Sequence, residues 1–225
     1  MQVRREGLFS RWAAGAALAS LAWSAHAVVP GQVETFSGAS TTWSNGAGNI
    51  VPVQLMPSGG PGGTGDAFLQ TSSSGGAGAG SRLVLLAPDS WDGDYLAASV
   101  GAISLDLNNL GSTDLSLRLL LEKDTLTRAV TTQFLLLPAN SGWRSFQFSV
   151  LPQDLAGPAA AALAQVTQLR LIHAVDPVFP GPAITAVLGI DNVSAVAAIP
   201  EPASAWLLMG GMAGLVVLRR RNART

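Results

Sequence analysis

The central part of the chain alternates hydrophobic and polar positions with a period of two, which predicts β-strands. The clearest run is 114–122, where every second residue from Leu115 to Leu121 is leucine and can face a core. Leu120 interrupts the polar face of this run, so we expect that face to be partly covered. Similar runs predict strands at 32–36, 67–71, 82–87, 103–107, 131–137, 145–150, 166–172 and 187–196.

Short strands at fairly regular spacing, separated by clusters of Gly, Pro, Asn and Asp, are typical of all-β proteins. The sequence therefore predicts an all-β domain, an antiparallel β-sandwich or jelly roll, over residues 28–199. The alanine-rich stretch 154–165 predicts one short helix at an end of the sandwich. Two segments rich in Gly and Ser, 57–66 and 71–80, predict mobile surface loops.

The N-terminal segment is hydrophobic without alternation. Three arginines among the first eleven residues precede an apolar stretch, 12–23, which is shorter than the ~20 residues of a membrane-spanning helix. The small residues Ala25 and Ala27 follow, one position apart. This order predicts a signal peptide helix over 1–27, export through the secretion translocon, and cleavage by signal peptidase after Ala27. An N-terminal membrane anchor is the alternative.

The C-terminal segment, 200–225, has three parts in order. An uncharged stretch, 203–218, lies between two short motifs: Pro200, Glu201, Pro202 and then Arg219, Arg220, Arg221. As a helix the uncharged stretch is about 24 Å long, which predicts a short transmembrane helix in the inner membrane. The arginines favour the cytoplasmic side, so the body of the protein is expected outside the cytoplasm.

This order of motifs resembles the PEP-CTERM sorting domain of Gram-negative bacteria, in which Pro-Glu-Pro, a short hydrophobic helix and a basic end follow one another. The resemblance implies that exosortase, a membrane protease, recognises the tail and that the protein is sorted to the cell surface. Exosortase systems commonly accompany exopolysaccharide production, so the resemblance also suggests a surface polysaccharide as a partner. A plain C-terminal membrane helix is the alternative.

The body resembles a second family through segments spread over 32–196. These segments are Glu34-Thr35-Phe36, Trp43, Gly62-Gly63, Phe68-Leu69, 87–95, 103–107, Trp143 with Phe146, and 188–193. In this order they look like the laminin IV type A domain and the wider galactose-binding-like jelly rolls, which include many carbohydrate-binding modules. The resemblance implies a structural Ca²⁺ ion shared by Glu34 and Asp191. Solvation or hydrogen bonding of both carboxylates at strand ends is the alternative.

Aromatic side chains are the predicted ligand-binding residues, because their rings can stack on sugar rings. Trp91 and Tyr95 lie in a loop-like stretch, so we expect them to be exposed and predict them to contact a carbohydrate. Core burial is the alternative for Trp91. Trp43 and Trp143 lie beside predicted strands and are expected in the core.

Charge and composition exclude several classes of function. The body holds six basic and twelve acidic residues, a net charge of about −6, which offers no basic surface to nucleic acid. Cysteine is absent, which excludes disulfides and thiolate catalysis. The body has one histidine, His173, in a predicted strand, and no hydrolase motif accompanies it. We therefore expect no enzyme activity and no cofactor apart from the calcium ion.

Together these patterns predict an exported protein of the cell envelope or extracellular matrix that the tail anchors transiently in the inner membrane. Its predicted role is to bind or organise the surface polysaccharide layer. Two other classes stay open, a purely structural surface protein without a ligand and a secreted hydrolase with an unrecognised site.

Overall fold

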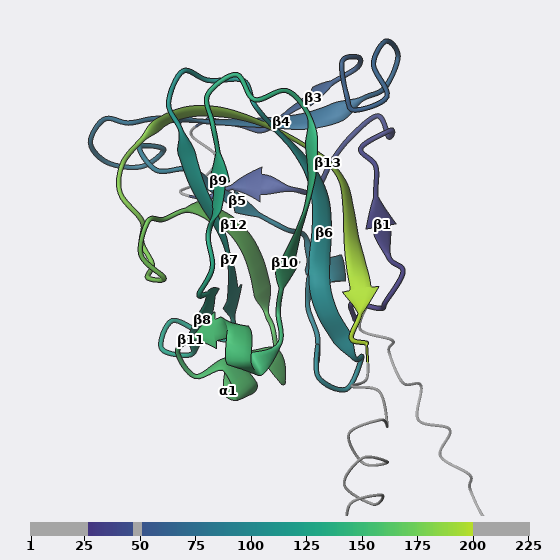
Figure 1. Ribbon diagram of the computed structural model, residues 1–225, viewed down its shortest axis with the longest axis vertical. Coiled ribbons are helices and arrows are strands. Elements are labelled where there is room, and N and C mark those ends of the chain that lie inside the picture. The colour runs from purple at the N-terminus through teal and green to yellow at the C-terminus, as the bar shows by residue number, and fades with distance from the viewer. Residues whose placement is uncertain (1–26, 47–50, 200–225) are drawn as a thin grey trace, which may run out of the picture.

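The computed structural model describes residues 27–46 and 51–199, so the predicted signal helix and transmembrane helix lie outside the described residues. Two antiparallel sheets pack face to face, and one short α-helix accompanies them (Figure 1). This confirms the prediction of an all-β jelly roll. Within the described part of the chain, every helix is too short or too polar to cross a membrane.

The first sheet has six strands in the order β10-β6-β13-β4-β3, and β1 also pairs with β13. Their bounds are β1 (Val33–Glu34), β3 (Gln54–Met56), β4 (Phe68–Ser74), β6 (Val100–Asn109), β10 (Arg144–Ser149) and β13 (Thr185–Ala197). The second sheet has seven strands in the order β11-β8-β7-β12-β5-β2, and β9 also pairs with β7. Their bounds are β2 (Ser44–Asn45), β5 (Val84–Leu86), β7 (Leu115–Glu122), β8 (Arg128–Thr131), β9 (Leu135–Leu137), β11 (Leu155–Ala156) and β12 (Gln168–His173).

The alternation in β7 sorts its side chains between the two faces of the second sheet as the sequence predicts. The alternate leucines from Leu115 to Leu121 are buried in the main core between the sheets. Each buried leucine contributes about 1.5–3 kcal/mol, so the period of the pattern decides which face turns inward. The buried hydrophobic residues of the described chain, from Val28 to Ala195, pack mainly into one cluster, so we expect residues 28–199 to fold as a unit.

The outer face of the second sheet is partly covered, as the interruption at Leu120 predicts. Leu120 lies there in a small cluster with Val130, Ile172 and Ala174. Phe179, from the connection between β12 and β13, packs against this cluster. The connection therefore shields part of a sheet face that would otherwise expose leucine and isoleucine to water.

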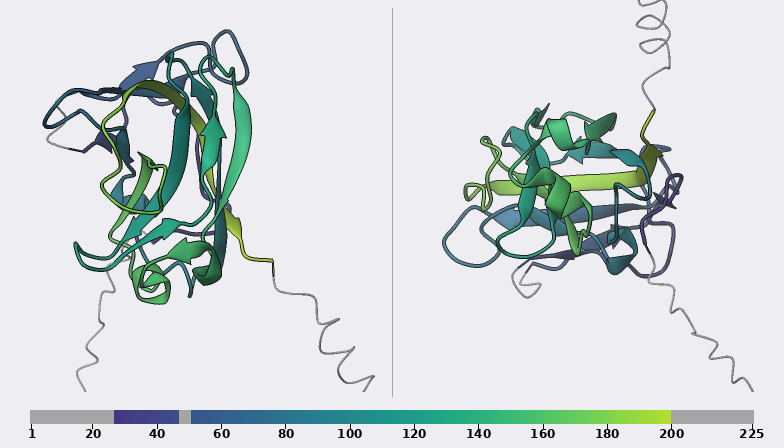
Figure 2. Two further views of the ribbon diagram at one scale, coloured as in Figure 1. Left: turned by 60° about the vertical axis from the view of Figure 1, so that its left-hand side comes forward. Right: turned by 90° about the horizontal axis from the view of Figure 1, so that it is seen from below.

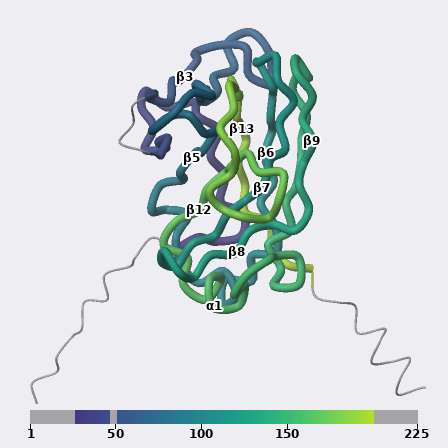
Figure 3. Tube along the Cα trace, turned by 90° about the vertical axis from the view of Figure 1, so that its left-hand side faces the viewer, coloured from purple at the N-terminus to yellow at the C-terminus, as the bar shows by residue number. Residues whose placement is uncertain are grey.

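The predicted helix at 154–165 is shorter than its alanine content suggests. A 3₁₀ turn, η2 (Pro152–Asp154), and β11 occupy its first part, and α1 spans only Ala159–Leu163. Gly157 takes a φ of +97° and Pro158 follows it, so the chain cannot continue as one helix. In Figures 2 and 3, α1 lies at one end of the sandwich, opposite β3.

The segment 71–74 belongs to β4, so predicting it as part of a mobile loop is wrong. Ser72, Ser73 and Ser74 pair with Val187, Ala186 and Thr185 of β13. The side chain of Ser73 is buried and its hydroxyl donates to the carbonyl of Ile184. A run of Thr and Ser has no hydrophobic alternation, so the pattern alone could not identify this part of the strand.

Candidate functional site

Trp91 and Tyr95 are core residues, so predicting them as exposed carbohydrate contacts is wrong. Their exposed fractions are 1% and 0%. A 3₁₀ turn, η1 (Asp89–Trp91), folds the loop-like stretch inward, and Trp91 packs edge-on against Trp43 with ring centroids 6.1 Å apart. The hydroxyl of Tyr95 donates to the carbonyl oxygen of Trp91 at 2.8 Å, and burial raises the pKa of Tyr95. Trp43 is buried, as predicted.

Trp143 is not in the core, so its predicted burial between the sheets is wrong. Its ring is half-buried and packs edge-on against Phe68, with centroids 5.2 Å apart. A Cβ added at Gly189 of β13 would lie 3.0 Å from the Trp143 ring, so the glycine lets the indole lie close to the sheet. The indole nitrogen donates to the carbonyl oxygen of Gly59 at 2.8 Å.

The structure places the predicted calcium ligands Glu34 and Asp191 in one negatively charged neighbourhood of the first sheet. Asp191 is 1% exposed, and its Oδ1 accepts the amide of Asn192 at 2.7 Å. Burial raises the pKa of Asp191 to about 6, and repulsion from Asp66, Asp106 and Glu34 adds to the effect. Among the described residues, no three acidic, histidine or cysteine side chains form a group that could hold a metal ion.

Asp191 is expected to make the stability of the body depend on pH. Its pKa is about 6 in the folded state and 3.8 in the unfolded state. The protonated carboxyl therefore stabilises the fold fully below pH 3.8, and this stabilisation is lost as the pH rises through 6. In calcium-free buffer at pH 7, Asp191→Asn should therefore raise the free energy of unfolding by up to about 3 kcal/mol, and the gain should vanish near pH 4. Urea unfolding measures both.

The same variant, Asp191→Asn, also tests the predicted calcium site. If Glu34 and Asp191 hold Ca²⁺, adding the ion raises the melting temperature of the native body but not that of Asp191→Asn. The exposed Asp176 provides a matched control, since Asp176→Asn removes the same charge elsewhere. Melting curves of the native body that are identical with Ca²⁺ and with chelator would refute the calcium site.

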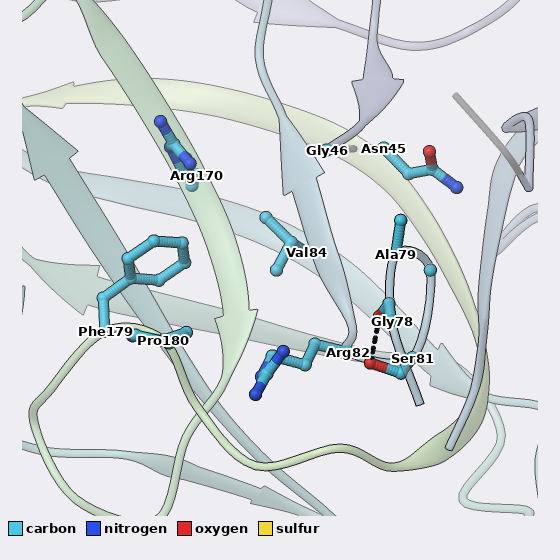
Figure 4. Close-up of a pocket in the computed structure, with 11 residues that line it drawn as sticks. Asn45, Gly46, Gly78, Ala79, Ser81, Arg82, Val84, Arg170, Phe179 and Pro180 are labelled. Carbon is cyan, nitrogen blue, oxygen red and sulfur yellow. Dashed lines mark hydrogen bonds between the residues drawn. The ribbon is translucent and has the colours of Figure 1, made fainter. Parts of the chain in front are cut away.

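A pocket of about 190 Å³ lies on the outer face of the second sheet (Figure 4). Val84 of β5 lies at its centre in this view, with Phe179 and Arg170 on one side and the turn 78–81 on the other. Arg82 completes the wall beside Val84. The pocket thus combines aliphatic and aromatic surface with two guanidinium groups, and none of the described residues that line it is a carboxylate.

An ion-pair network fixes the aromatic side of the pocket. Glu122 accepts from Arg128 at 2.7 Å and from Arg170 at 3.1 Å through its two carboxylate oxygens. The guanidinium carbons of these arginines lie 5.0 and 5.2 Å from the centroid of the Phe179 ring. The ring is therefore held by two cation–π contacts. Arg170 Nε is buried beside the pocket without a hydrogen-bond partner in the described chain.

Arg82 is the exposed cation of the pocket. Its Nε donates to the carbonyl oxygen of Gly181 at 2.7 Å, which fixes the guanidinium, and the described chain offers it no salt bridge. A fixed guanidinium beside an aromatic ring can bind a carboxylate through two parallel hydrogen bonds. This site could not be predicted from the sequence, because Arg82, Arg170 and Phe179 belong to no recognisable motif.

His173 has the structural role that its place in a strand predicts. It is 6% exposed, and its Nδ1 accepts the backbone amide of Ser116 at 3.0 Å. Burial lowers its pKa, so the neutral ring is favoured. A ring nitrogen that already accepts a backbone hydrogen bond is not free to take a proton from a substrate.

Comparison with solved structures finds distant likenesses. A family 11 carbohydrate-binding module of Clostridium thermocellum has a TM-score of 0.48 at 13% identity, over 78% of this chain and 99% of that one. PfGH50B and an exo-beta-agarase have TM-scores of 0.48 and 0.47 at 9% and 11% identity, over 73% and 72% of this chain. This chain spans only 23% and 26% of those two enzymes. At such identities and TM-scores, nothing carries over from those proteins.

The C-terminal segment matches a protein-family model. A comparison with curated proteins finds no match. Residues 198–221 match the family model described as the PEP-CTERM protein-sorting motif. The predicted motif residues from Pro200 to Arg221 lie outside the described residues but inside this match. The chain therefore carries a PEP-CTERM sorting motif, which implies processing by an exosortase, export and transient membrane anchoring at the C-terminus.

Proposed function

We propose that this protein is displayed at the cell surface or in the extracellular matrix, where its body binds an acidic polysaccharide at the pocket beside Arg82 and Phe179. The signal peptide, 1–27, and the tail, 200–225, serve its export and sorting, and residues 28–199 form the binding domain. The role is that of a binding protein rather than a hydrolase.

One observation carries this proposal, the concentration of positive charge at the pocket. The body has six basic and twelve acidic residues, yet two of the arginines line this pocket and a third, Arg128, stacks on the same Phe179 ring. Glu122 neutralises only one of these three charges. A sugar carboxylate would pair with the exposed Arg82, while the apolar face of the sugar ring would lie against Phe179 and Val84.

The pocket is tested by replacing its exposed cation. Arg82→Gln should weaken binding of an oligogalacturonate to purified 28–199 by about tenfold or more, because a charge-assisted bidentate contact contributes roughly 1.5–3 kcal/mol. Isothermal titration at low and moderate salt measures this loss. The matched control is Arg144→Gln, which removes the same charge from an exposed position on β10 of the other sheet.

Neutral and carboxyl-reduced glycans test whether the sugar carboxylate is needed for binding. Reduction of the carboxylates to alcohols should abolish binding, and inorganic phosphate should not compete at concentrations similar to those of the sugar. Equal losses of affinity for Arg82→Gln and Arg144→Gln would show that the glycan binds somewhere other than this pocket. Failure of every acidic and neutral glycan to bind would refute the binding role and leave the purely structural one.

A further inference from the structure

The first buried residue of the described chain is Val28, the residue predicted to begin the mature protein. Its side chain is 0% exposed, whereas Ala27 and Val29 on either side are exposed. The Val28 nitrogen donates to the backbone carbonyl oxygen of Asp92 at 2.8 Å. The predicted cleavage site therefore adjoins the point where the chain enters the core.

Gly93 shapes the place where this nitrogen lies. A Cβ added at Gly93 would lie 3.1 Å from the Cβ of Ala27 and 3.4 Å from the nitrogen of Val28. Gly93 also exchanges two backbone hydrogen bonds of 2.8 Å with Val166, which tie this turn to the second sheet beside α1. The start of the body is thus held against a turn that is itself anchored on both sides.

The carboxylate of Asp92 lacks a partner at this turn. Its Oδ1 is buried and accepts no hydrogen bond from the described chain. Burial raises the pKa of Asp92 to about 6, and repulsion from Asp89 adds to the effect. Tyr95 is the other titratable group whose pKa responds to the charge of Asp92. A buried, unpaired carboxylate costs free energy, so a cation at this place would stabilise the fold.

We propose that cleavage after Ala27 creates this cation: the α-ammonium of Val28 pairs with the Oδ1 of Asp92 and fastens the start of the mature domain. Hydrolysis adds the hydroxyl of water to the Ala27 carbonyl carbon and its hydrogen to the Val28 nitrogen, which is protonated at neutral pH. The amide of the uncleaved chain has one hydrogen, which the Asp92 carbonyl uses. The ammonium has three, so it keeps that bond and supplies a second to Oδ1.

Because of this pairing, the body is more stable after signal-peptide cleavage than before it. The inference depends on the predicted cleavage position and is independent of the proposed binding function. Signal-peptide cleavage must also come before the pairing, because the ammonium of Val28 exists only after the signal peptidase has acted. In the uncleaved chain, Asp92 keeps an unpaired oxygen.

Two forms of the body that differ in one acetyl group test the pairing. Purified 28–199 with a free Val28 amine should melt about 3–6 °C higher at pH 7 than the same chain with an acetylated amine. The difference should vanish below about pH 4, where Asp92 is protonated, and above about pH 9, where the amine is neutral. Asp92→Asn should remove it at every pH.

Titration of the Asp92 carboxyl tests the pairing without relying on a change in stability. Carboxyl ¹³C NMR should show a lower pKa for Asp92 in the free-amine form than in the acetylated form. Equal pKa values and equal melting temperatures in the two forms would overturn the proposal, whether or not Asp92→Asn folds. Sequencing of the exported protein that finds a first residue other than Val28 would also overturn it.

Discussion

Replacing Trp91 with alanine is expected to destabilise the body by about 3–5 kcal/mol. The side chain is 1% exposed and packs against Trp43, which in turn packs edge-on against Phe36 with centroids 5.7 Å apart. Truncation therefore opens a cavity within a chain of three aromatic rings that connects the N-terminal segment to η1. Urea unfolding, followed by tryptophan fluorescence, measures the loss.

Trp143→Ala provides the control, since it removes the same side chain from a half-buried place on the outer face of the first sheet. Its cost should be clearly smaller, about 1–2 kcal/mol. The folded fraction of Trp91→Ala should still bind the acidic glycan with native affinity. A Trp91→Ala protein of native stability that has lost glycan binding would instead restore the predicted role of Trp91 as a carbohydrate contact.

Loss of the Arg118 guanidinium is expected to cost about 3–5 kcal/mol. The side chain is 3% exposed and donates to four backbone carbonyl oxygens, those of Thr131, Thr132, Ala174 and Val175. These bonds tie β7 to the end of β8 and to the start of the β12–β13 connection. In Arg118→Met all four carbonyls lose this donor while the aliphatic volume is largely kept.

The exposed Arg144 again provides a matched control, and Arg144→Met should change the free energy of unfolding by less than about 0.5 kcal/mol. Hydrogen exchange should also show faster opening of the β12–β13 connection in Arg118→Met. If Arg118→Met and Arg144→Met unfold at the same urea concentration, the four hydrogen bonds contribute no net stability.

The strands could be predicted wherever a local pattern decides the structure. In β7 the alternating leucines identify the strand, its inner face and even the covered outer face at Leu120. β2 and β3 contain two and three residues, too few to establish a period, and they were not predicted. The strand end at Ser72–Ser74 is polar on both faces, so only its pairing with β13 reveals it.

The candidate site could not be predicted because the fold assembles it from distant segments. Asn45, Arg82, Arg170 and Phe179 all line the pocket, yet they are separated by up to 134 positions in the sequence. The aromatic residues that local sequence did favour, Trp91 and Tyr95, are both buried: η1 includes Trp91, and the hydroxyl of Tyr95 donates to the Trp91 carbonyl oxygen. A loop-like composition describes the backbone around a side chain and does not reveal its exposure.

The central position of β13 determines how a force applied through the C-terminal tail would act on the domain. β13 spans 13 residues and pairs with β6 along one side and with β4 and β1 along the other (Figure 1). The match to the sorting motif begins at residue 198, immediately after the end of β13 in the sequence. If the second sheet holds a polymer, as proposed, a pull on that polymer against an anchored tail would put tension along β13 and across the core. Both ladders then share the load in shear instead of opening one hydrogen bond at a time.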